Sequence, residues 1–157
     1  MNKQFDSALF QTARNTFENL AFMLSLEEGD AGPSPLSERR SVTVDFTGPL
    51  SGRLVVSISP PLMPELATSM LGLDGAEPSP TQQQDAFKEL GNIICGNLLP
   101  AIAGTQAVFA VSAPILVADG DAPNSPAPTP TATANLTLEN GAAELALYVN
   151  EKTDNQS

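Results

Sequence analysis

A helix with two different sides is encoded by Asp85-Ala-Phe-Lys-Glu-Leu-Gly-Asn-Ile-Ile-Cys-Gly-Asn97. Because an α-helix advances about 100° per residue, four residues of this stretch fall within a stripe roughly 60° wide. They are Asp85, Glu89, Asn92 and Gly96. The opposite side is apolar, so we expect burial of Phe87, Leu90, Ile94, Leu98 and Ala101. A short polar row on an anchored helix can present chemistry to a molecule outside the protein.

The ends of this helix are marked by residues typical of caps and stops. Thr81 is the expected N-cap, because its hydroxyl can accept a hydrogen bond from the first turn. We expect the helix to run from Thr81 to Leu99, with Pro100 close to its end. The alternative is that Pro100 kinks a longer helix that ends at Gly104.

The preceding sequence alternates between helical and strand patterns. Apolar residues at three- and four-residue steps predict a first helix over residues 6–26. Alternating apolar residues then predict a hairpin over residues 42–59. A short second helix is expected over residues 64–71, closed by Gly72.

The sequence after the polar row adds a strand, a loop and a closing hairpin. Residues 106–118 have the pattern of a strand, and the proline-rich residues 119–131 are expected to form a long exposed loop. The last hairpin is expected over residues 132–149, with its turn at Asn140-Gly141.

Together these elements define a fold class and a domain. With 157 residues, the chain is most simply one domain over residues 1–150, followed by a disordered tail at residues 151–157. The pattern predicts an α+β fold, in which long helices pack on one face of an antiparallel sheet.

A faint internal repeat relates the two halves of this domain. Residues 15–23, Asn-Thr-Phe-Glu-Asn-Leu-Ala-Phe-Met, align without gaps on residues 85–93, so that Phe22 takes the place of Asn92. We therefore expect two pseudo-duplicated α-β-β halves that share one sheet. Asn19 takes the place of Glu89 in this alignment, and we expect the first half to have lost a polar site to packing.

The composition excludes several classes of function. The net charge is −11 and there is no histidine, so nucleic acid and anionic membrane surfaces are poor partners. A single cysteine excludes an intramolecular disulfide framework and a thiolate zinc site. Without histidine there is no Ser-His-Asp or Cys-His arrangement. The sequence therefore predicts no metal site.

Two features bear on localisation. The first residues, Met-Asn-Lys-Gln-Phe-Asp, lack the apolar core of a signal peptide. The longest apolar run, Val108 to Ala118, is too short to cross a bilayer. We expect a soluble, cytoplasmic protein.

The polar row combines an acid with an amide. Glu89 and Asn92 lie on adjacent turns, and a carboxylate and a carboxamide alone make a weak self-contained catalyst. An amide can still orient a water molecule, since it both donates and accepts hydrogen bonds. Such a pair works best when the electrophile arrives with the substrate. Gly96, without a side chain, would let another surface approach closely.

The order of these residues resembles the D/S-x3-E-x2-N signature of the CheC/CheX/FliY phosphatases of bacterial chemotaxis. Asp85, Glu89 and Asn92 match the signature, and Pro114 lies about where the family places its downstream proline. A single intact motif is similar to the CheX branch. With the order of elements, the resemblance covers roughly residues 5–150.

The resemblance implies dephosphorylation of a response regulator such as phospho-CheY. By carry-over from the family, Asn92 would orient the attacking water and Glu89 would contact the regulator's active-site lysine. Asp85, Gly96 and Pro114 would belong to the partner-binding surface. The resemblance also implies no cofactor of the chain's own, because the Mg²⁺ ion belongs to the regulator.

Other interpretations remain open at this point. The row could be an ordinary solvated helix face, and Asp85 could simply favour the helix's first turn. The protein could also be a non-catalytic module that binds a regulator, or a homodimer formed through exposed strand edges. Cys95 is expected to serve packing and not reactivity.

Overall fold

The computed structural model describes residues 3–20, 38–73, 77–117, 129–138 and 141–150. Three helices and six strands occur in these residues. Their order along the chain is α1 (Lys3–Leu20), β1 (Arg40–Thr47), β2 (Ser51–Ile58), α2 (Leu62–Leu71), α3 (Pro80–Ala103), β3 (Ala110–Val111), β4 (Ile115–Leu116), β5 (Ala132–Leu138) and β6 (Gly141–Asn150). The expected α+β class is confirmed.

The strands form one antiparallel sheet in the order β3-β1-β2-β6-β5, with β4 also paired to β1. Two hairpins, β1–β2 and β5–β6, supply its four longer strands. They meet where β2 pairs with β6 and Leu54 lies opposite Leu147. Both hairpins agree with the sequence-based prediction, but Gly141, expected in the second turn, already belongs to β6, and Asn140 lies outside the described residues.

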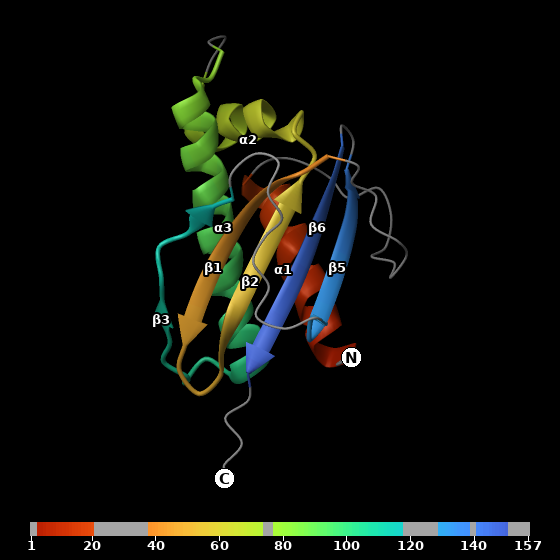
Figure 1. Cartoon of the computed structure of the whole chain (residues 1–157), viewed down its shortest axis with the longest axis vertical. Helices are drawn as coiled ribbons and strands as arrows, with labels where there is room; N and C mark the ends of the chain where they lie inside the picture. The colour runs from red at the N-terminus through yellow and green to blue at the C-terminus, as the bar shows by residue number, and fades with distance from the viewer. Residues whose placement is uncertain (1–2, 21–37, 74–76, 118–128, 139–140, 151–157) are drawn as a thin grey trace.

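The long helices cover one face of this sheet. In Figure 1, α1 and α3 run behind the strands, and α2 crosses near their upper end. The α1 helix packs on β5, whereas α3 packs on β1. Each long helix therefore covers the outer strand of the other half, an arrangement that agrees with two pseudo-duplicated halves.

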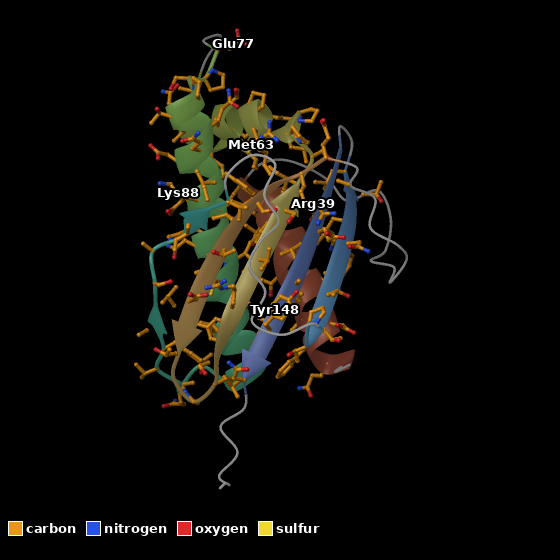
Figure 2. All side chains as sticks on the ribbon, in the orientation of Figure 1. Arg39, Met63, Glu77, Lys88 and Tyr148 are labelled. Atoms are coloured by element: carbon orange, nitrogen blue, oxygen red, sulfur yellow. The ribbon has the colours of Figure 1, made fainter. Side chains whose placement is uncertain are left out.

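The core lies between the helices and the sheet, where alternate strand residues point towards the helices. Its largest fully buried side chains are Phe17, Phe46, Phe87, Leu9, Leu54, Ile58, Leu62, Leu66, Leu90, Ile94, Leu98 and Leu136. No described helix covers the opposite face, which carries Tyr148 (Figure 2). The site helix α3 is thus held firmly along one side.

Some boundaries differ from those expected. The first helix begins at Lys3 and not at residue 6, and its expected end near residue 26 lies outside the described residues. Most of the expected loop at 119–131 and the tail at 151–157 also lie outside them. The α2 helix ends as predicted at Gly72, whose φ of 65° is in the left-handed region that suits glycine.

The strand expected over residues 106–118 is instead two short strands beside β1. Phe46 pairs with Val111 and Thr43 with Ile115, so three steps along β1 correspond to four steps along the edge segment. The extra residue is a bulge that contains Pro114, which has no N–H to offer the ladder. The prediction of one continuous strand was therefore wrong.

Candidate functional site

The N-terminus of α3 is fixed by a capping box. The Ser79 Oγ atom accepts a hydrogen bond from the Gln82 N–H at 3.1 Å, and Gln82 Oε1 accepts one from the Ser79 N–H at 2.9 Å. Pro80 occupies the first helical position, where its fixed φ suits the helix. The prediction of Thr81 as the N-cap was wrong because the helix has already begun there.

The other end of α3 follows the longer of the two expected alternatives. The helix passes through Pro100 and ends at Gly104, whose N–H donates to the Pro100 carbonyl at 2.8 Å. Pro100 has no N–H and cannot donate to the carbonyl of Gly96, four residues earlier. Ala101, which we expected to be buried, is exposed in the last turn, beyond Leu99, the last buried residue of the helix.

The apolar side of α3 packs closely on β1. Phe87, Leu90, Ile94 and Leu98 are fully buried. A Cβ atom at Gly91 would lie 2.9 Å from Val42 Cγ1, so a side chain there would push the helix from the strand. Gly91 serves this contact and points away from the polar row.

Cys95 is an inert packing residue, as expected. Its side chain is fully buried within the core. Burial raises the pKa of the Cys95 thiol to about 12, with a smaller contribution from the negative charge of Asp45. The thiol is therefore protonated at neutral pH and cannot act as a nucleophile.

The polar row faces outward from this anchored helix. Asp85, Glu89 and Gly96 are exposed, and Asn92 is half-buried. Lys88 projects from the outer side of α3 (Figure 2), with its Nζ atom 3.9 Å from Asp85 Oδ1. Such an exposed pair contributes little stability.

The side chains of Glu89 and Asn92 have no partner within the described residues, and Gly96 leaves open space beside the helix. Within the described residues, neither the Glu89 nor the Asn92 side chain takes part in a hydrogen bond or an ion pair. A Cβ atom at Gly96 would find no other atom within 4 Å. The row therefore offers an acid, an amide and room for a second surface, and no contact within the described chain requires glycine at position 96.

Pro114 lies beside α3 but not in the row. It is half-buried in the bulge between β3 and β4. The following strand, β4, contacts α3 as well as β1. Pro114 therefore shapes the sheet edge that adjoins the site helix.

A cleft between α1 and α3 was not predicted from the sequence. Its volume is about 410 Å³, and its lining residues are Thr12, Asn15, Thr16, Asn19, Leu20, Ile93 and Asn97. Asn15 and Asn19 are exposed. The expected loss of the polar site in the first half depends on Phe22, which aligns with Asn92 in the repeat and lies outside the described residues. The repeat alignment contained a signal for this cleft, since it placed Asn15 and Asn19 opposite Asp85 and Glu89.

Among the described residues, no group of three or more His, Cys, Asp or Glu side chains is placed to hold a metal ion. No helix in the described part of the chain is long and apolar enough to cross a membrane.

The chemistry available to the row is limited and specific. An exposed carboxylate and amide, with no activated nucleophile beside them, can orient water and bind a partner but supply no electrophile or metal. Any reaction at this row would therefore need a reactive group that is carried by another molecule.

The chain belongs to the CheX family of chemotaxis phosphatases. Residues 40–130, which include the whole row and Pro114, match the family model described as "Chemotaxis phosphatase CheX". This match confirms the resemblance found in the sequence. None of the curated proteins matches the chain significantly.

Solved structures with the same fold cover nearly the whole chain. CheX from Desulfovibrio desulfuricans has a TM-score of 0.74 at 16% identity, with 93% of this chain and 99% of that chain covered. CheX from Vibrio vulnificus has a TM-score of 0.73 at 16% identity, with 96% and 100% covered. The CheX–CheY–BeF3–Mg²⁺ complex from Borrelia burgdorferi has a TM-score of 0.68 at 14% identity, with 92% and 97% covered.

Proposed function

We propose that this protein hydrolyses the aspartyl phosphate of a response regulator of the CheY type. The observation that carries the proposal is the row on α3, where Glu89 is exposed and neither it nor Asn92 is engaged within the described residues. The row lies inside the range matched by the phosphatase family. The Borrelia burgdorferi neighbour, a CheX bound to CheY with BeF3 and Mg²⁺, supports a CheY-type partner.

Asn92 enters the regulator's phosphorylation site in this proposal and orients a water molecule in line with phosphorus. Glu89 contacts a lysine of the regulator and fixes the docked orientation. Hydrolysis of a phosphoryl group asks mainly for positioning and charge stabilisation, which an inserted amide can supply. The Mg²⁺ ion belongs to the regulator, so the protein needs no cofactor of its own.

Three other residues complete the proposed docking surface. Asp85 extends the row at its N-terminal end, and Gly96 leaves room for close approach. Pro114 holds the adjoining sheet edge in its bulged shape. The protein would act in the cytoplasm, where phosphorylated receiver domains are found.

The decisive experiment is phosphate release from a labelled, phosphorylated receiver domain with and without this protein. Asn92→Ala is expected to abolish the acceleration, and Glu89→Ala to raise KM more than it lowers kcat. Gln84→Ala is the matched control, since Gln84 is exposed on α3 but lies outside the row. Circular dichroism should show all three variants folded.

Full activity of Asn92→Ala would refute this mechanism. Equal phosphate lifetimes with and without the wild-type protein, despite measurable binding, would instead identify a non-catalytic regulator-binding module.

We further propose that the protein forms a homodimer through the sheet edge beyond β1. Val108, Val111 and Ile115 are 82%, 38% and 59% exposed along this edge. An exposed apolar edge strand offers both side chains and unpaired backbone groups to another chain. Sedimentation velocity should show a dimer that Ile115→Glu converts to a monomer; a wild-type monomer at high concentration would refute the dimer.

A further inference from the structure

The cleft between α1 and α3 continues the surface of the polar row. Ile93 and Asn97 line the cleft from α3 and directly follow Asn92 and Gly96 in the chain. One residue step turns the helix by about 100°, so these side chains lie on the flank of α3 next to the row. A partner docked on the row therefore meets the cleft along its side.

The amides of the cleft are available for a partner. Thr16 is buried, and its hydroxyl already donates to the Thr12 carbonyl at 2.8 Å. Asn15, Asn19 and Asn97 are exposed, and none of their amides forms a hydrogen bond within the described residues. Three side chains that can each donate and accept hydrogen bonds thus meet in one cleft of about 410 Å³.

The charge of this cleft differs from that of the protein around it. The chain carries a net charge of −11, yet none of the seven residues that line the cleft is charged. In the internal repeat, Asn15 and Asn19 occupy the positions of Asp85 and Glu89. An amide donates hydrogen bonds to acidic groups, whereas a carboxylate only accepts and would repel them.

We propose that the cleft is a second docking contact, which binds an acceptor-rich loop of the response regulator beside its phosphorylated aspartate. The inference rests on the proposed function, because the regulator must first dock on the row. An aspartyl-phosphate site that holds Mg²⁺ is necessarily rich in carboxylate and phosphoryl oxygens. Uncharged amides can donate to such a surface without repulsion from an otherwise acidic protein.

The test compares the double variant Asn15→Asp/Asn19→Asp with Asn150→Asp. All three are Asn→Asp changes at exposed positions, but Asn150 lies at the end of β6 and does not line the cleft. We expect the double variant to raise KM for the phosphorylated receiver at least about fivefold, with kcat unchanged. Asn150→Asp should leave both constants at their wild-type values.

Two further measurements separate charge from hydrogen bonding. The rise in KM caused by the double Asp variant should be smaller in 1 M salt. There the Debye screening length is about 3 Å, compared with about 10 Å at about 0.1 M. Asn15→Ala/Asn19→Ala should also raise KM, about fivefold or more and independently of salt, because it removes two donors without adding charge.

The outcomes distinguish this inference from the proposed function. If wild-type protein does not accelerate phosphate release, the proposed function fails and the docking contact falls with it. If wild-type protein is active but the double Asp variant keeps the wild-type KM, only the cleft contact is refuted. A KM raised by Asp but unchanged by Ala would also overturn it, because the amides would then donate nothing to the partner.

Discussion

Replacement of Gly96 by alanine should strengthen the fold and weaken docking at the same time. Gly96 lies inside α3, its φ is not positive, and a Cβ atom there meets no other atom within 4 Å. Alanine should therefore stabilise the domain by about 0.5–1 kcal/mol through helix propensity alone. For a chain of this size, that gain corresponds to a rise in Tm of about 1–4 °C.

The same methyl group would stand where the partner is proposed to approach. Forcing an extra methyl into a packed contact costs typically about 1–3 kcal/mol. Since about 1.4 kcal/mol is a factor of ten, we expect KM for the phosphorylated receiver to rise about tenfold. Urea unfolding measures the first effect, and steady-state phosphate release measures the second.

Each half of this prediction can fail separately. A loss of stability would mean that glycine at position 96 serves an internal contact. A gain in stability with unchanged KM would mean that no partner surface comes close to Gly96, and the docking orientation proposed for α3 would be refuted.

Three further predictions concern the helix that carries the site. Gly91→Ala should destabilise the domain by about 1 kcal/mol net in urea unfolding, because its Cβ atom would lie 2.9 Å from Val42 Cγ1; equal or greater stability would contradict the close packing of α3 on β1. Ser79→Ala should lower the free energy of unfolding by about 1 kcal/mol through loss of the N-cap, whereas Thr81→Ala should be nearly neutral. If Thr81→Ala instead had the lower urea midpoint, Thr81 would be the N-cap, as predicted from the sequence. Because the pKa of the buried Cys95 thiol is raised from 9.0 to about 12, the unfolded state loses this proton first, so stability should fall between pH 9 and 12. Cys95→Ala should show a smaller loss over that pH range, and an equal loss would assign it to other groups.

The sequence predicted most accurately the features that depend on a periodic pattern within one helix or one hairpin. Periodic burial identified the apolar side of α3 and both hairpins, because each depends on alternation within a few residues. The cap was misplaced since Thr81 and Ser79 have the same chemistry two residues apart, and Pro80 between them decides which one is used. A local pattern is insufficient where two residues compete for one role.

Features that depend on tertiary structure could not be predicted in this way. An apolar run from Val108 to Ala118 indicates a strand but not the register slip at Pro114, which arises from pairing with β1. The cleft needs α1 and α3 side by side, which follows from the packing of each helix on the other half. The row itself was predicted as a face, whereas the lack of partners for the Glu89 and Asn92 side chains within the described residues emerged only from the structure.

Pro100 has a consequence for the choice of partner. Because it lacks an N–H, the backbone oxygen of Gly96 has no intrahelical i+4 donor, at an exposed position in line with Glu89 and Asn92. A partner that covers Gly96 gains by donating a hydrogen bond to this oxygen, since burial of an unpaired carbonyl costs about 1–3 kcal/mol. The backbone at Gly96 thus favours partners that present a hydrogen-bond donor at this point. Substitution of the Asp85, Glu89 or Asn92 side chain would not remove this preference.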